Sequence, residues 1–396
     1  MSQSFSLAQV NSFVLTRQHL SRPALGSDLE RTVRDVGGLH STSASVPYLS
    51  LRARHTTFAK KQLQRALYEK RSLAKVLCMR NTLFILPKEL LPVAYQATKK
   101  RRDANIARYL RHYGFTRQDY ERAVAATKEL MGTAALTAAE MKGELRDSHL
   151  DIVVDLMPND WQLVRGRPRG SWRSNLHEYS SFQVWFSDVD LLSLSEEAAQ
   201  ERLVQHYLSA LGPATEKDIA WWAGLGKTAI RRAVVGASRP IAEIEIKELG
   251  AGFLMLEEDV KLLIDHVSAP TGVALLPSLD PYIMGYKDRT RFVDPSKHHK
   301  VFDRAGNALP TVWHDGQVIG VWIEDGKRAC IEVLLFDETD SQLRGMIEEQ
   351  AGNLSLFLEH NTPDIRIGPY PDDVYPKTPF SLGRKSEPSV QEENHD

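Results

Sequence analysis

Cysteine is scarce in this sequence, because its 396 residues include only Cys78 and Cys330. The two lie far apart, and neither has a second cysteine or an ordered histidine beside it. Zinc sites and disulfide frameworks need such spacing, so the sequence indicates neither, and we expect no metal and no cofactor. Free cysteines are often core residues, so both thiols are predicted to be buried.

Long apolar runs are absent as well. No window of the sequence approaches the roughly 18 uncharged apolar residues that a membrane span needs. The start, Met1-Ser2-Gln3-Ser4-Phe5, lacks the basic-then-apolar layout of a secretory signal. A cytoplasmic protein without a membrane partner is therefore expected.

An overall charge of one sign is missing too, since 50 Lys and Arg stand against 51 Asp and Glu. The balance conceals a basic block. Residues 52–122 hold 18 Lys and Arg against 5 Asp and Glu, with Tyr95, Tyr109, Tyr113 and Tyr120 among them. Clustered cations neutralise phosphates well, so the block favours a nucleic acid as partner. Solvated helix faces are the other interpretation.

The chain is too long for one ordinary core, and two to four modules are expected. In the first, Thr57 can cap a helix over residues 58–69, followed by a helical turn or two over 72–78 and a strand over 81–86. Helix, helix, strand is typical of a winged helix. We assign residues 1–95 to it.

The second module repeats this order over residues 96–190. Helices are predicted over residues 104–112, 117–131 and 138–145, and strands over 160–165 and 181–186. The polar loop between the strands is an Arg-rich wing carrying Arg165, Arg167, Arg169, Trp172 and Arg173. Such a wing suits phosphates or a groove, although a merely solvent-exposed hairpin would give the same pattern.

A third winged helix is predicted over residues 191–265. Thr215 and Asp218 have the spacing of a capping box, and Gly224 and Gly226 place a turn before a helix over 227–234. A helix-turn-helix with glycine in the turn reads nucleic acid through its second helix. Winged helices also serve as protein-interaction modules, so this motif alone leaves both uses open.

Short strands dominate from residue 272, and Asp315-Gly316 and Asp325-Gly326 are hairpin signals. We predict a β-barrel-like domain with one helix over residues 266–376, and a disordered tail over 377–396. The expected fold class is α+β, with tandem winged-helix modules packed on a C-terminal antiparallel β-barrel-like domain.

Three stretches of the sequence then point to one family: residues 37–54, 211–222 and 276–289. Together they resemble the AlkZ/YcaQ-like winged-helix proteins, some of whose members are DNA glycosylases. The resemblance implies three tandem winged helices against a C-terminal β-barrel, with a concave face for double-stranded DNA. It also implies excision of N7-alkylated purines, including bulky adducts and crosslinks.

The family's catalytic signature is Gln, an apolar or small residue, then Gln or Asp, just after a Gly-Gly-Leu-like turn. Here that place holds His40-Ser41-Thr42, which departs at both functional positions. A neutral histidine with an ordinary pKa near ~6.5 can accept a proton from water, and a hydroxyl two residues on can hold the same water. We therefore predict His40, Thr42 and Ser43 as catalytic residues. A structural, hydrogen-bonded His40 is the alternative.

The remaining site predictions concern DNA. The cationic and polar candidates for DNA binding are Gln18, Arg54, Lys60, Lys61, Arg80, Arg165, Arg167, Arg169, Lys227 and Arg231. Asp280, Tyr282 and Arg289 are candidates to line the DNA channel, unless an Asp288–Arg289 ion pair braces the barrel instead. Trp221 and Trp222 are predicted to be core residues.

Two classes of function follow from these features. The first is a monofunctional DNA glycosylase, expected to act as a monomer. The second is a non-catalytic DNA-binding protein or regulator. A His40 at the floor of a basic concavity would favour the first, and a buried His40 the second.

Overall fold

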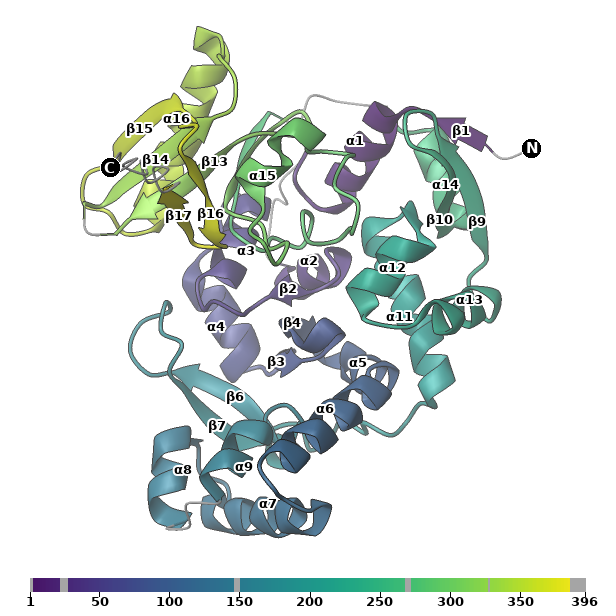
Figure 1. Ribbon diagram of the computed structural model, residues 1–396, viewed down its shortest axis with the longest axis vertical. Helices are drawn as coiled ribbons and strands as arrows, with labels where there is room; N and C mark the ends of the chain where they lie inside the picture. Colours follow the sequence, from purple (N-terminus) through teal and green to yellow (C-terminus); the bar gives the residue numbers. More distant parts are fainter. Residues whose placement is uncertain (1–2, 22–27, 146–149, 268–271, 327, 385–396) are drawn as a thin grey trace, which may run out of the picture. The chain divides into compact units, whose positions relative to one another are not determined.

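The computed structural model describes residues 3–21, 28–145, 150–267, 272–326 and 328–384. It has an α+β fold (Figure 1). The chain divides into two compact units. The first unit comprises residues 1–271 and 280–291, and the second comprises residues 272–279 and 292–396. Residues 280–291, which were assigned to the C-terminal domain, therefore belong to the first unit.

A three-stranded antiparallel sheet lies in the N-terminal part of the first unit, with strand order β2-β4-β3. Its strands are β2 (Leu39–His40), β3 (Leu73–Leu77) and β4 (Leu83–Pro87), and the helices around it are α2 (Leu29–Asp35), α3 (Val46–Arg54) and α4 (Lys60–Tyr68). The helical turn predicted over 72–78 is wrong, because this buried apolar run pairs with β4 instead. Helix α4 begins at Lys60, so Thr57 does not cap it.

The second sheet of the first unit has the order β5-β7-β6. The helices and strands in this part of the chain are α5 (Leu91–Ala97), α6 (Lys99–His112), α7 (Arg117–Met131), β5 (Leu136–Thr137), α8 (Ala138–Leu145), α9 (Leu150–Leu156), β6 (Leu163–Pro168), β7 (His177–Ser181) and α10 (Phe182–Trp185). The bounds predicted for α7 and α8 are confirmed. The strand predicted over 181–186 is wrong, because β7 ends at Ser181 and the chain turns into α10.

A four-stranded sheet with the order β1-β9-β10-β8 completes the first unit. The strands of this sheet and the helices beside them in the sequence are β1 (Gln3–Phe5), α1 (Leu7–Arg17), α11 (Glu196–Leu211), β8 (Ala214–Thr215), α12 (Glu216–Ala223), α13 (Lys227–Val235), β9 (Ile241–Ile246), β10 (Gly250–Leu256) and α14 (Glu257–Ile264). The predicted capping box is confirmed by hydrogen bonds between Thr215 and Asp218 in both directions. Gly224 ends α12 in the left-handed conformation, with φ of 71°.

The second unit is built on one five-stranded sheet with the order β11-β12-β13-β14-β15. Its elements are β11 (Val273–Leu276), α15 (His298–Val301), β12 (Thr311–His314), β13 (Gln317–Asp325), β14 (Cys330–Leu335), α16 (Ser341–Phe357), β15 (Asp364–Pro369), β16 (Val374–Thr378) and β17 (Ser381–Arg384). The predicted hairpin at Asp315-Gly316 is confirmed, because both residues have positive φ between β12 and β13.

The prediction of an antiparallel β-barrel needs correction. Within the described residues, β11 and β15 do not pair with each other, so the sheet is open at both edges. In addition, β14 and β15 run parallel. The connection through helix α16 makes this possible, since parallel neighbours need a long crossover.

The predicted disordered tail also begins too early. Residues 374–384 form the hairpin of β16 and β17, with Pro376 opposite Leu382. The rest of the predicted tail, residues 385–396, lies outside the described residues. The two cysteines are both buried, as predicted. In the described part of the chain, no helix is long and apolar enough to span a membrane.

Candidate active site and nucleic-acid interface

Two consecutive glycines bring the chain into β2. Gly37 and Gly38 have φ of 82° and 95°, in the region that residues with a side chain rarely adopt. A Cβ atom at Gly38 would lie 2.6 Å from a methyl carbon of Leu86. The pair therefore lets β2 enter the sheet beside β4 and fixes where His40 lies.

His40 points into the molecule from the end of β2. It pairs with Phe84 across the ladder, and the two ring centroids lie 4.3 Å apart. Its exposed fraction is 1 %. Neither of its ring nitrogens has a hydrogen-bond partner among the described residues. This imidazole therefore lacks the polar contacts that a buried structural histidine usually makes.

The surroundings of His40 keep its ring neutral. Burial, and secondarily the positive charge of Arg80, lower the pKa of His40 to about 3. At neutral pH the ring can still donate one hydrogen bond and accept one. It is, however, a far weaker base than the ordinary histidine assumed from the sequence, so it is better suited to hold a water than to take its proton.

Thr42 and Ser43 do not share the face of His40. The chain bends at both residues, whereas the predicted alignment of residues 40 and 42 required extended backbone. Thr42 is exposed, and Ser43 Oγ lies 3.3 Å from Ser45 Oγ. The predicted pairing of His40 with Thr42 on one side is therefore not met.

A basic corner, defined here as Arg80, Arg101, Arg289 and Trp221, lies next to His40 in the first unit. The guanidinium carbons of Arg80 and Arg289 lie 3.8 and 4.8 Å from the Trp221 ring centroid. Arg101 donates a hydrogen bond to the carbonyl of Gly224 at 3.3 Å. Trp222 is buried as predicted, but Trp221 is only half-buried and lies against two of the cations.

The basic corner is poor in negative charge around Arg80. Burial, and then the charges of Arg289 and Arg101, lower the pKa of Arg80 to about 10. Within the described residues Arg80 makes no ion pair, and its Nε has no hydrogen-bond partner. An arginine without a carboxylate partner, such as Arg80, is suited to bind a phosphate, whereas the charges of Asp218 and Asp288 act on Arg289.

The backbone that carries Arg80 to this corner is strained. The short helix η1 (Met79–Asn81) connects β3 to β4, and Arg80 and Asn81 have φ of 54° and 59°. Left-handed conformations in two successive residues other than glycine are costly and cluster at functional sites. Helix α12 packs against η1 and so supports its position.

Arg54 and Gln18 are not available to DNA, which corrects two of the predictions. Arg54 donates two hydrogen bonds to the carboxylate of Asp280, at 2.7 and 2.8 Å, and both side chains have exposed fractions of 0 %. Gln18 is equally buried and donates to the carbonyl of Ala210. This network joins α1, α3 and residues 280–291, so its role is to hold the first unit together.

The three candidates for the DNA channel also lie in different settings. The Asp280 carboxylate is paired with Arg54, and Tyr282 is fully buried with its ring edge-on to Tyr286. These two predictions are wrong for a channel wall. Arg289 does reach the basic corner. Asp288 accepts hydrogen bonds from the backbone and side chain of Thr290.

The wing arginines are largely neutralised by carboxylates. Arg167 pairs with Glu69 at 3.1 Å, and Arg169 pairs with Glu178 at 2.8 Å. The wing is also less exposed than predicted, because Trp172 is buried against Tyr48. The charges of Arg167 and Arg169 are thus already balanced within the protein.

Arg165 lies in a different setting, at the base of the wing. It is half-buried near Lys75 of β3 and His177 of β7, which are both buried. Burial, and then Arg165, lower the pKa of Lys75 to about 7. Burial, Lys75 and Arg165 together lower that of His177 to about 3. None of the three makes an ion pair within the described residues, so this cluster carries unbalanced charge.

The remaining DNA-binding candidates lie near the surface of the first unit. Lys61 and Lys227 are exposed, and Lys60 lies with its ammonium 4.5 Å from the Trp172 ring centroid. Arg231 is exposed but pairs with Glu216 at 3.0 Å. Among the described residues, no group of three His, Cys, Asp or Glu side chains is placed to hold a metal ion.

Sequence reasoning missed Arg101, Trp221, Lys75 and His177. Arg101 lies in the run Lys99-Lys-Arg-Arg102, so its charge was visible but its target was not. Trp221 was assigned to the core with Trp222. No local signal marks Lys75 or His177, because their proximity depends on how β3 lies beside β6.

Comparison with known proteins shows which family this chain resembles. A family model described as "DNA glycosylase AlkZ-like" matches residues 33–357. An interstrand DNA cross-link repair glycosylase from Streptomyces sahachiroi is 27 % identical over 177 residues, which cover 43 % of this chain and 46 % of that protein. The solved structure of the S. sahachiroi DNA glycosylase AlkZ has a TM-score of 0.77 at 21 % identity, covering 92 % of this chain and 100 % of that one. The chain belongs to the AlkZ-like DNA glycosylase family.

Proposed function

We propose that this protein is a DNA glycosylase that hydrolyses the N-glycosidic bond of N7-alkylated purines in double-stranded DNA, including those in interstrand crosslinks. Its family membership supports glycosylase chemistry, and its relative in Streptomyces is named for cross-link repair. We further propose that residues 1–95, 96–190 and 191–265 are three winged-helix modules that hold the duplex.

One observation carries this proposal, namely the unpartnered imidazole of His40 beside the basic corner. An N7-alkylated purine is already cationic, so it departs readily and the enzyme needs chiefly to orient a water toward the sugar. A neutral imidazole with both nitrogens free can bind that water. Arg80 and Arg289 can bind the flanking phosphates and so hold the sugar near His40.

Phosphate binding would also change His40 itself. Arg80 contributes to the low pKa of His40, and a phosphate on Arg80 offsets that positive charge. The imidazole then becomes a better acceptor only when DNA is bound. Burial is the larger cause of the low pKa of His40, so the acidic limb of activity should still lie below the ordinary histidine pKa of 6.5.

The burial of His40 favours a second candidate function. With an exposed fraction of 1 %, the ring reaches solvent only if neighbouring groups move. A protein that binds DNA without cutting the glycosidic bond has no need for such access. Non-catalytic DNA binding is therefore the alternative.

Excision of N7-methylguanine from a duplex, read out as abasic sites, tests the proposal. Wild type should release the base, and His40→Ala should lower the rate by about 10², the scale of a lost positioning contact, while leaving DNA affinity nearly unchanged. His40→Gln recreates the first residue of the family signature and should retain measurable activity. His299→Ala, an exposed histidine of the second unit, is the matched control.

The outcomes separate the two functions. Full activity in His40→Ala would remove His40 from the reaction. DNA binding by wild type without release of any N7-alkylated base, from single lesions or from crosslinks, would establish the binding-only function.

A further inference from the structure

A cavity of about 410 Å³ opens in the first unit between η1, α6 and the C-terminal end of α9. Its lining combines three amides (Asn81, Asn105 and Asn159), two tyrosines (Tyr109 and Tyr113) and two exposed basic side chains (Arg108 and His112) above apolar contacts. None of the residues predicted to be catalytic lines it. Clefts in which polar groups converge beside apolar contacts are typical of small-ligand sites.

Asn105 lines this cavity and carries a hydrogen-bond donor without a partner. Arg108 donates to Asn105 Oδ1 at 3.2 Å, which fixes the orientation of the amide. The opposite atom, Asn105 Nδ2, is buried and has no partner among the described residues. A buried donor without a partner is costly unless a ligand or water occupies it. A ligand acceptor in the cavity would satisfy this donor once the Asn105 amide turned toward it.

Aromatic rings lie at the mouth of the cavity. The centroids of Tyr109 and Tyr113 are 4.8 Å apart, and His112 lies at the same distance from Tyr113. Tyr113 is 47 % exposed, which is unusual for so large a ring. Exposed aromatic rings beside cations are the features on which unstacked bases rest.

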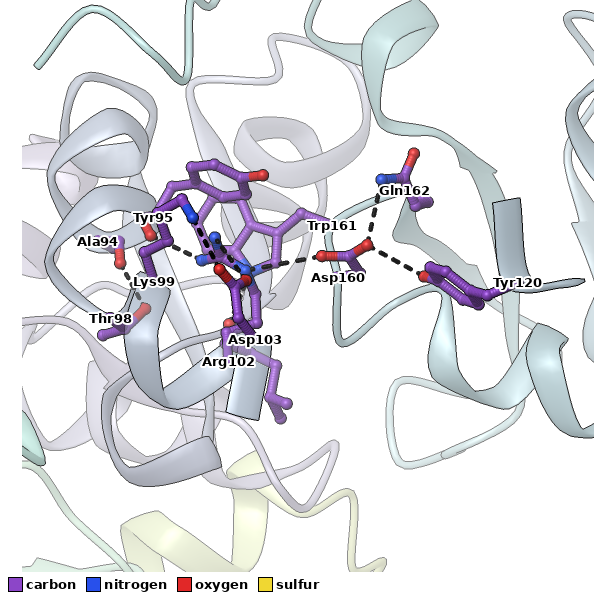
Figure 2. A network of polar contacts seen from close by, with 11 residues as sticks. Ala94, Tyr95, Thr98, Lys99, Arg102, Asp103, Tyr120, Asp160, Trp161 and Gln162 are labelled. Carbon is purple, nitrogen blue, oxygen red and sulfur yellow. Dashed lines mark hydrogen bonds and ion pairs between the residues drawn. The ribbon is translucent and has the colours of Figure 1, made fainter. Parts of the chain in front are cut away.

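The charge of the cavity is arranged in two layers. At the base, Arg102 lies over Tyr95 at 3.8 Å and faces Asp160 at 3.7 Å, and Asp160 accepts a hydrogen bond from Tyr120 (Figure 2). At the rim, Arg108 makes no ion pair within the described residues. The deep cation is thus balanced, while the outer one is available to an anion.

Acceptor atoms, a flat ring and a phosphate together describe a nucleotide. We propose that this cavity binds a nucleotide of the DNA that has left the base stack, with its base against Asn105 and Tyr113 and its phosphate at Arg108. The role rests on the proposed function for its biological use, but the binding itself does not depend on catalysis. The energetic cost of unstacking is least at a damaged pair, so capture here would favour lesions.

The test uses two probes on the full chain. Guanosine 5′-monophosphate is titrated by NMR, and a duplex with 2-aminopurine at a mismatch reports unstacking by fluorescence. Asn105→Ala, Arg108→Ala and Tyr113→Ala should each weaken the mononucleotide about tenfold and reduce the fluorescence change. Asn159→Trp should fill the cavity and abolish both signals. Asn353→Ala, an exposed amide of α16, is the control.

Each outcome decides the proposal separately from the glycosylase assignment. Mononucleotide binding that the cavity variants weaken, and that His40→Ala leaves intact, supports the site even if wild type excises no base. Absence of binding in wild type, or binding that persists in Asn159→Trp with a native melting midpoint, overturns it. Thermal melts of each variant exclude unfolding as the cause of lost binding.

Discussion

Two arginine sites of the first unit, the Arg54–Asp280 pair and the basic corner, look alike in sequence but differ in their partners. Arg54 and Arg80 both lie in the basic block of residues 52–122, and both were predicted to bind DNA. Arg54 is fully buried with a bidentate carboxylate. Arg80 is half-buried against Trp221 and makes no ion pair within the described residues. The partner, and not the positive charge, separates a structural arginine from a candidate ligand-binding one.

The difference has a simple physical basis. A buried pair is tolerated because each charge replaces the water that the other has lost, and removing one partner leaves the other exposed to the full desolvation cost. Converging cations instead raise each other's energy, which an incoming phosphate relieves. The first arrangement is stable alone, and the second is completed by a ligand.

Breaking the pair should have the largest effect. Arg54→Ala leaves the Asp280 carboxylate buried without its partner and should destabilise the first unit by about 3–5 kcal/mol, measured by urea unfolding. The exposed Arg65→Ala on α4 should change stability by less than about 0.5 kcal/mol. A stable Arg54→Ala protein with weakened DNA binding would instead restore Arg54 as a DNA contact.

Removing the cation of the basic corner should act on DNA and not on folding. Arg80→Ala should lower DNA affinity about tenfold and flatten the slope of log affinity against log salt by roughly 0.9. Its melting midpoint should stay the same or rise, since a like charge beside Arg289 and Arg101 is lost. Arg304→Ala, exposed in the second unit, should leave both quantities unchanged. A destabilised Arg80→Ala with native DNA affinity would make Arg80 structural.

Lys75 extends the comparison to stability and pH. Its pKa is lowered from 10.5 to about 7 by burial and then by Arg165. The unfolded chain therefore binds more protons between these values, and stability should rise with pH across that window. Lys75→Met should raise the melting midpoint by several degrees at pH 7, and the gain should shrink toward pH 10.5. A constant gain at every pH would show that packing, and not charge, is responsible.

The wing should give the smallest effect. Arg167 and Arg169 already pair with carboxylates, so a phosphate gains little from them. Arg167→Ala with Arg169→Ala should flatten the salt slope by clearly less than the roughly 0.9 per residue of a full contact. If the slope flattened by roughly 0.9 for each of the two arginines, these ion pairs would have to open when DNA binds.

Local rules predicted much of the helical fold. The capping box at Thr215, the glycine turn at Gly224 and the helices α7 and α8 depend on neighbouring residues, and those predictions are confirmed. The predictions that failed depend on distant partners. Residues 72–78 become a strand through pairing with β4, and β15 joins the sheet in parallel from beyond a helix.

The candidate site was predictable only in part for the same reason. The Gly-Gly turn located His40, but nothing in the sequence indicates that Phe84 and Arg80 surround its ring. Likewise, the cation-rich block identified Arg54 and Arg80 equally, because Asp280 lies more than 200 residues away from Arg54. Which carboxylate reaches which cation is settled by packing alone.

The two glycines before His40 also have a use in searching for distant relatives. A Cβ atom at Gly38 would collide with Leu86, so a larger residue there would displace β2 whatever chemistry followed. The strand pairing of β2, by contrast, is made by backbone groups and specifies no particular side chain at residue 40. A search pattern anchored on Gly37-Gly38 and on the apolar side chains of β4 should therefore recover distant relatives whatever residues follow the glycine turn.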